Sequence, residues 1–296
     1  DQGPLSQKTS EKRIMSESIE DIILDHDKRG VAALRPYLPV DYCTHAAQFV
    51  LDHPGNVVIA TGFYILMSGS AETDGPPGAL AIGNALRQLG MKVSFVSDAY
   101  AVPALRELAG PDFEVVEFGI TGPETGQAAA TWLLEEMEPD LLISIERCGR
   151  NRDNAYLNMR SVDISDQTAR IDYLFETETP SVGIGDGGNE IGMGNLVQVI
   201  PTFASLPKLP ATTWVDRLVV ASVSNWGGYG LVAALSLLSG QNLLPTVEHE
   251  ARMVERLVEL GLVDGTTGDA TPYVDGFTTQ EHGSALERLH TLVEEG

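Results

Sequence analysis

Short apolar segments alternate with amphipathic segments along most of the chain. The apolar segments are five or six residues long and rich in Val, Ile and Leu, which is typical of strands buried on both faces of a parallel sheet. We therefore expect strands over residues 56–61, 92–97, 113–118, 141–145, 181–185 and 218–223. Apolar positions at helical spacing predict helices over residues 16–29, 41–53, 78–89, 103–108, 126–136, 165–175, 229–238, 249–260 and 284–293.

This order of elements predicts a three-layer α/β fold, in which a mostly parallel sheet carries helices on both faces. Two helices precede the first strand and form an N-terminal helical extension. Residues 1–15 are polar and are expected to be disordered, so residues 16–296 form a single domain in this interpretation. Ligands of such sheets bind beyond the carboxyl ends of the strands, which directs the search for a site to the loops that follow them.

Composition narrows the class of protein. The chain has 296 residues, of which 43% are hydrophobic, and a net charge of −23. It is long enough for a full core, whereas its acidic surface repels nucleic acid and anionic membranes, so we expect neither as a partner. No apolar run reaches the roughly 18 residues of a membrane span, and no apolar signal core lies near residue 1. We therefore expect a cytoplasmic protein and leave homo-oligomerisation open.

The strongest chemical signal is the segment Gly183–Asn195, in which six of thirteen residues are glycine. Glycines let a backbone approach a ligand closely, and several N–H groups can then converge on an anion. A tight strand-to-helix crossing would explain two or three glycines, but not the acids and amides between them. Asp186 and Glu190 are therefore candidate catalytic groups and candidate ligands of Mg²⁺ or Mn²⁺. The candidate substrate-binding residues of this segment are Gly185, Gly187, Gly188, Asn189 and Asn195.

The same segment contains a partial dinucleotide motif. Gly183, Gly185 and Gly188 match the spacing G-x-G-x-x-G. The acidic residue that such sites place about twenty residues further on is absent, since that region reads Phe203 to Leu209. We therefore expect no NAD. No lysine lies in any of the loop motifs, so we expect no pyridoxal phosphate (PLP) either.

Arginines gather in the stretch 146–160, which holds four of them in a strongly acidic chain. Arginine binds carboxylate or phosphate through two parallel hydrogen bonds, so Arg147, Arg150 and Arg160 are candidates for holding a substrate carboxylate. The alternative explanation is an internal salt-bridge network, and both roles can be present together. Its acidic partners would be Glu146, Asp153 and Asp163.

Three other loops contribute candidates. Asp74 lies in the long loop 61–78, where it either caps the following helix or acts in the site. Asn225 lies in the glycine-rich stretch 224–230, directly after a predicted strand, and is a candidate substrate contact. Asp275 and His282, near the end of the chain, are weaker candidates for acid–base catalysis.

Two of these motifs carry a family resemblance. The stretch ERCGRNRDNAYLNMRSVDIS followed by GIGDGGNEIGMGN resembles the D-glutamate cyclase family, and the resemblance runs from about Tyr42 to the end of the chain. It implies a lyase that converts D-glutamate to 5-oxo-D-proline and water without ATP. Vertebrate members carry an additional N-terminal domain that this sequence does not include. The family supplies no catalytic assignment here, so the roles above come from the residues themselves.

Two alternatives remain open at this point. The glycine-rich segment Gly183–Asn195, called the glycine block below, would also suit an enzyme that acts on a sugar phosphate or a nucleotide, because converging N–H groups bind phosphate. A non-catalytic protein that binds an acidic metabolite would use the same residues. The density of acids beside the glycines favours catalysis over binding alone.

Overall fold

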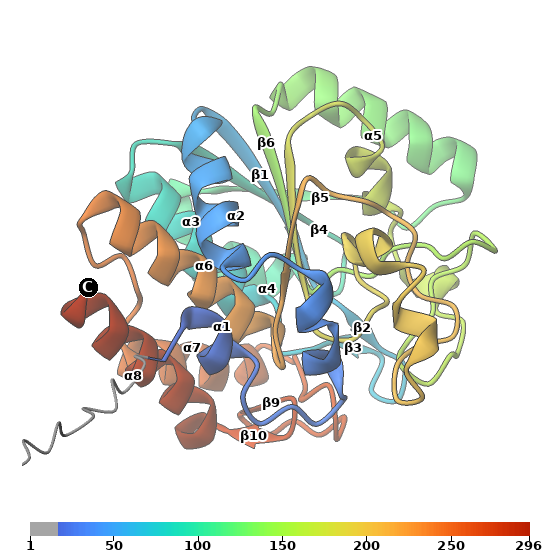
Figure 1. The fold of residues 1–296 in the computed structure, drawn as a ribbon. Helices are drawn as coiled ribbons and strands as arrows, with labels where there is room; N and C mark the ends of the chain where they lie inside the picture. The colour runs from blue at the N-terminus through green and yellow to red at the C-terminus, as the bar shows by residue number, and fades with distance from the viewer. Residues whose placement is uncertain (1–16) are drawn as a thin grey trace, which may run out of the picture.

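A computed structural model describes residues 17–296 (Figure 1). Its centre is a six-stranded parallel sheet with the order β5-β4-β1-β6-β7-β8. The strands are β1 (Asn56–Thr61), β4 (Lys92–Ser97), β5 (Glu114–Glu117), β6 (Leu141–Ile145), β7 (Ser181–Gly185) and β8 (Arg217–Val220). Strands β6 and β7 are buried along their whole length, as expected for a parallel sheet with both faces covered.

The strand order creates a crevice in the middle of the sheet. The chain begins at the centre with β1, adds β4 and β5 on one side, and then returns to add β6, β7 and β8 on the other. The connections after β1 and β6 therefore leave the sheet in opposite directions. In open α/β sheets, ligands bind at this switch point, beyond the carboxyl ends of the two strands.

Helices cover both faces of the sheet, as Figure 1 shows. Helices α2, α3 and α6 pack on one another against one face, and α5 lies on the opposite face. The helices are α1 (Ile19–Ile23), α2 (Tyr42–Asp52), α3 (Pro76–Gln88), α4 (Val102–Ala109), α5 (Pro123–Met137), α6 (Ser224–Ser239), α7 (Val247–Glu259) and α8 (Thr279–Glu295). Two small antiparallel ribbons complete the fold: β2 (Tyr64–Ile65) with β3 (Ser70–Ala71), and β9 (Tyr273–Val274) with β10 (Phe277–Thr278).

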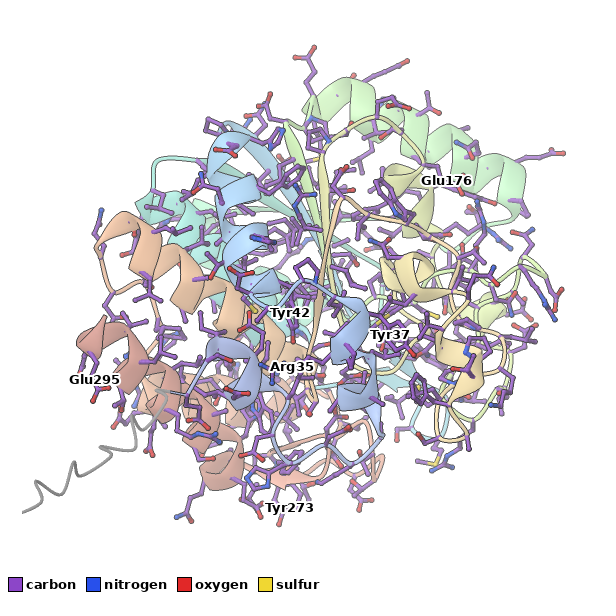
Figure 2. All side chains as sticks on the ribbon, in the orientation of Figure 1. Arg35, Tyr37, Tyr42, Glu176, Tyr273 and Glu295 are labelled. Carbon is purple, nitrogen blue, oxygen red and sulfur yellow. The ribbon has the colours of Figure 1, made fainter. Side chains whose placement is uncertain are left out.

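The N-terminal helices are part of this packed structure. Helix α1 contacts α6 and α8, and α2 contacts α6 and β8. Tyr42, at the start of α2, lies in the interior (Figure 2), where its hydroxyl donates to the carbonyl of Val220 at 2.5 Å. Among the described residues, no helix is long and apolar enough to span a membrane.

The three-layer α/β fold expected from the sequence is confirmed, but three elements differ. The helix expected over 16–29 ends at Ile23, because Asp27 then forms a turn by accepting from the N–H groups of Arg29 and Gly30. The segment 165–175 forms two short 3₁₀ helices, separated at Thr168, which is extended. The expected disorder of residues 1–15 lies outside the described residues.

The third difference is the start of α6. The stretch 224–230 was expected to be a loop, but it forms the first two turns of the helix. The carboxylate of Asp74 accepts from the backbone N–H groups of Ser224 and Asn225, at 2.9 and 2.8 Å. It thereby satisfies donors that are otherwise unpaired at a helix start. A cap that lies 150 residues away along the chain cannot be recognised from local sequence.

Candidate functional site

A cavity of about 210 Å³ lies beyond the carboxyl ends of the strands. Its walls come from the loops after β1, β6 and β7, from the N-terminal segment and from residues 265–266. Pockets for drug-sized ligands are larger, roughly 300–1,000 Å³, so this cavity suits a small metabolite. The charged residues that line it are Arg29, Glu72, Glu146, Arg160, Asp186 and Glu190.

Three buried carboxyl groups meet beside the cavity. Asp74 comes from the loop between β1 and α3, Glu146 directly follows β6, and Asp186 directly follows β7. One carboxylate oxygen from each lies within 4.8 Å of the others, a spacing at which all three can bind one metal ion. We call these residues the carboxylate triad. Oxygen-only ligands of this kind suit Mg²⁺ or Mn²⁺.

The start of α6 supports the triad. Besides the two N–H groups bound by Asp74, the hydroxyl of Ser224 donates to Glu146 Oε2 at 2.5 Å. The partial positive charge at a helix N-terminus favours such carboxylates. Glu146 has a φ of 44°, in the left-handed region that costs a non-glycine residue free energy, and such strain is typical of functional sites. Asn225 holds the neighbouring turn, because its Oδ1 accepts from the N–H groups of Gly75 and Gly78.

Burial raises the pKa of the acids in this cluster. The pKa of Asp74 rises to about 7, because burial and the charge of Asp275 outweigh the hydrogen bonds from α6. Burial also raises the pKa values of Glu72, Glu146 and Asp186 well above their ordinary values. Carboxyl groups crowded together away from water retain protons near neutral pH unless a cation replaces them.

Arg29 brings a positive charge to the cluster. Its Nη1 lies 2.5 Å from Asp186 Oδ2, and Nη1 and Nη2 each lie 2.8 Å from an oxygen of Asp275. Burial alone would lower the pKa of Arg29, but Asp186 and Asp275 raise it well above its ordinary value. The guanidinium therefore remains charged and fixes Asp186 relative to Asp275.

The glycine block has a different internal arrangement from the one expected. Its converging N–H groups bind a carboxylate of the block itself: Gly187 and Gly188 both donate to Glu190 at 2.7 Å, and Asp186 donates at 3.3 Å. These donors are therefore already paired and are not free to cradle a phosphate. Glu190 still lines the cavity, and so does Asn189, whose Nδ2 donates to the carbonyl of Leu157.

The three candidate arginines occupy different environments. Arg147 is fully buried and donates to Asp98 Oδ2 at 2.6 Å and to the carbonyls of Gly62 and Ala169. The last of these bonds is made to the Ala169 carbonyl, which lies between the two 3₁₀ helices. Arg150 pairs with Asp172 and Glu176. Arg160 is exposed and lines the cavity.

The remaining candidates lie around the cluster. Asp275 is joined to it through Arg29. His282 is fully buried, with Nε2 3.1 Å from Glu250 Oε1, and its Nδ1 accepts from the indole of Trp226. Asn195 donates to the backbone carbonyl of Val215 and accepts from its N–H group. Gly185 is the last residue of β7. A Cβ at this position would lie 2.9 Å from Glu190 Oε2.

Three residues of the site were not among the predicted site residues. Glu146 was considered as an internal salt-bridge partner, although its position directly after a buried strand was a usable signal. Glu72 precedes α3 by only a few residues and lines the cavity. Arg29 gave no local signal, because only the folded chain brings it to Asp186, which lies 157 residues away in sequence.

A family model described as D-glutamate cyclase-like, C-terminal, matches residues 19–290. The match begins earlier than the resemblance seen in the motifs and includes α1 and Arg29. The human protein named D-glutamate cyclase, mitochondrial, is 30% identical over 293 residues, which covers 84% of this chain and 47% of the human protein. The chain therefore spans about half the length of that relative.

Solved structures resemble the chain only loosely. An Aeromonas hydrophila protein described as a short chain dehydrogenase/reductase family oxidoreductase is 14% identical with a TM-score of 0.33, over 60% of this chain and 90% of the other. A Bordetella bronchiseptica enzyme in complex with NAD⁺ is 15% identical with a TM-score of 0.30, over 64% and 54%. At such low sequence identity and TM-score, these structures do not indicate an activity for the chain. The family model, by contrast, spans most of the sequence, and the chain belongs to the D-glutamate cyclase-like, C-terminal, family.

Proposed function

We propose that the protein is a lyase that converts D-glutamate to 5-oxo-D-proline and water without ATP. The observation that carries the proposal is the carboxylate triad at the edge of a small cavity, in a chain of this family. The cavity combines acids that can bind a cation or move protons with arginines that can hold a carboxylate. Both are needed for a substrate that carries two carboxylates and an amine.

A divalent cation fits the triad. The three residues supply only carboxylate oxygens, all of them buried, and burial is the main reason why their pKa values are raised. Mg²⁺ or Mn²⁺ bound there would neutralise the oxygens of the substrate γ-carboxyl group and make its carbon more electrophilic. Asp74, Glu146 and Asp186 would hold it. Glu190, a second ligand expected from the sequence, binds backbone N–H groups instead.

The reaction itself moves two protons from nitrogen to oxygen. One passes from the substrate ammonium to the γ-carboxyl group, which leaves a free amine. The amine nitrogen then attacks the γ-carboxyl carbon, a C–N bond forms, and the carbonyl electron pair moves onto oxygen. When the pair returns, the C–O bond breaks; the leaving oxygen takes the second proton from nitrogen by way of a carboxyl group of the cluster and departs as water. Acids whose pKa lies near neutral pH suit this relay.

A product assay tests the proposal. The purified protein is incubated with D-glutamate, either with Mn²⁺ or Mg²⁺ or after chelation, and 5-oxoproline is measured. We expect product from the D isomer and not from L-glutamate, loss of activity after chelation, and loss in Asp186→Asn and Glu146→Gln. Tight binding of D-glutamate without turnover would instead identify a metabolite-binding protein. Activity that survives exhaustive chelation would rule out the metal.

The remaining expectations stand as proposals. A small amino acid is the proposed partner, and neither NAD nor PLP takes part. We propose a cytoplasmic location, which cell fractionation with an antibody against the chain would test.

A further inference from the structure

Arg29 is held in place more rigidly than any local sequence pattern suggests. The carboxylate of Asp27 accepts from the N–H groups of Arg29, Gly30 and Ala32 at 2.7 to 2.9 Å, and this turn presents the Arg29 side chain to the site. Lys28 anchors the same turn by donating to the carbonyl of Asp275. A side chain that is positioned by its own backbone loses little entropy when it binds a ligand.

Only some of the N–H groups of the Arg29 guanidinium donate hydrogen bonds to other residues described in the structure. Nη1 and Nη2 together face the two oxygens of Asp275, and the second N–H of Nη1 faces Asp186. Among the described residues, Nε and the second N–H of Nη2 have no hydrogen-bond acceptor. These two N–H groups lie on one edge of the planar group, with the spacing that matches a carboxylate. Arg29 lines the cavity, and its side chain is 23% exposed.

From this geometry, and resting on the cyclase reaction proposed above, we propose that the unpaired edge of Arg29 binds the α-carboxylate of the amino-acid substrate. Asp186 contacts Arg29 and also belongs to the triad. It therefore connects Arg29, which would hold the α-carboxylate, with the triad, which would act on the γ-carboxyl group. The substrate class is thus an amino acid with a second carboxylate at a fixed distance.

Arg160 is the competing candidate, because it also lines the cavity. Its environment is different: it is exposed, and its Nη1 contacts the sulfur of Met67 at 3.4 Å. An arginine that is held by two carboxylates keeps a fixed orientation, whereas an exposed side chain must be ordered at each binding event. The structure therefore favours Arg29.

The test compares two substrates in the full chain. D-Glutamate carries the α-carboxylate, whereas 4-aminobutanoate is the same molecule without it. We expect Arg29→Gln to lower kcat/KM for D-glutamate by about 10- to 100-fold, the range for lost hydrogen bonds to a charged group, and to leave kcat/KM for 4-aminobutanoate unchanged. Arg29→Lys keeps the charge without the planar fork and should recover only part of the loss. Arg35→Gln is the matched control.

Arg35 lies on the 3₁₀ helix that follows Gly30 (Figure 2) and pairs with Asp21, away from the cavity, so its loss should leave both rates unchanged. Calorimetric binding of glutarate and of butanoate gives the same comparison without turnover. We expect Arg29→Gln to weaken glutarate binding about 10- to 100-fold and to leave butanoate binding unaffected.

The outcomes separate the two proposals. An equal loss for both substrates would mean that Arg29 only supports the structure, and a selective loss in Arg160→Gln instead would transfer the role to Arg160; either result overturns this inference and leaves the cyclase proposal intact. If the wild-type protein neither converts D-glutamate nor binds glutarate, the proposed function itself fails.

Discussion

At the scale of single residues, the site is a place where acids are crowded together at a cost in free energy. Six buried carboxyl groups lie at or near the cavity. Three form the triad, and the other three are Glu72, Glu190 and Asp275. Arg29 offsets part of their charge, and backbone N–H groups offset another part. The triad is stable with protonated carboxyl groups or as the ligand of a cation, and the choice between the two depends on pH.

The pKa of Asp74 leads to a prediction about stability. Because it rises from 3.8 to about 7 on folding, the folded protein binds the proton more tightly, and the stabilisation is present below pH 3.8 and is lost as the pH rises through 7. We expect Asp74 by itself to lower the free energy of unfolding of the metal-free protein by on the order of 4 kcal/mol over this range. Urea unfolding with EDTA at pH 4, 5, 6, 7 and 8 measures it. The decline should be smaller in Asp74→Asn, and an identical decline in both proteins would contradict the assignment.

Glu190 provides a second prediction at this scale. Replacement by Gln keeps one acceptor oxygen but places an NH₂ group against the N–H donor of either Gly187 or Gly188, so we expect a loss of about 1–3 kcal/mol in the free energy of unfolding. The control is Glu135→Gln on the exposed side of α5, which should change it by less than about 0.5 kcal/mol. A Glu190→Gln protein of normal stability that no longer binds Mn²⁺ would show that Glu190 is a metal ligand instead.

At the scale of elements, the site depends on how closely α3 and α6 approach each other. The glycines at their crossing make this possible: a Cβ on Gly228 would lie 3.0 Å from Gly78 Cα and 2.9 Å from Ile145 Cδ1. The N-termini of both helices thereby lie beside Asp74, which caps α6 and directly precedes Gly75 at the start of α3. A change in helix spacing is therefore transmitted to the triad.

Gly228→Ala tests this coupling. The added methyl meets backbone, which cannot move aside as a flexible side chain can, so we expect a loss of about 1–3 kcal/mol in stability together with weaker Mn²⁺ binding. Gly119→Ala is the matched control, since its Cβ would meet only Thr121 Cγ2 at an ordinary 3.5 Å. Thermal unfolding and Mn²⁺ titration of both variants measure the two effects. Unchanged metal affinity in a destabilised Gly228→Ala protein would separate packing from the site.

At the scale of the whole molecule, residues from both ends of the chain complete the central site. Arg29 comes from the segment before the first strand, and Asp275 from the turn between β9 and β10. Helices α1 and α8 also contact each other and α6. From this packing we predict that residues 17–296 unfold as one unit.

The corresponding prediction is a single cooperative transition. Trp226 is buried, whereas Trp132 and Trp214 are 58% and 57% exposed, so the change in tryptophan fluorescence on unfolding reports mainly the interior near His282. We expect fluorescence and far-ultraviolet circular dichroism to give the same urea midpoint. Two separated midpoints would show that part of the chain folds independently.

The sequence by itself determined the fold class and indicated the loops in which the candidate site lies. Buried strands must be apolar throughout, and helices must repeat at 3.6 residues, so both periods are visible locally; the strands 56–61, 92–97, 141–145 and 181–185 are confirmed to the residue. The rule that ligands bind beyond strand ends then selected the loops that contain Asp74, Arg160, Asp186 and Glu190.

Only the tertiary structure decided what each side chain does. Asp74 caps a helix that begins 150 residues later, Glu190 binds the amides of its own loop, and Arg147 is buried against Asp98. Arg29 reaches Asp186 across 157 residues of sequence. Composition and spacing show which groups are present, but hydrogen bonds and ion pairs between distant residues depend on distances of a few ångströms, and only the packing of the folded chain sets those distances.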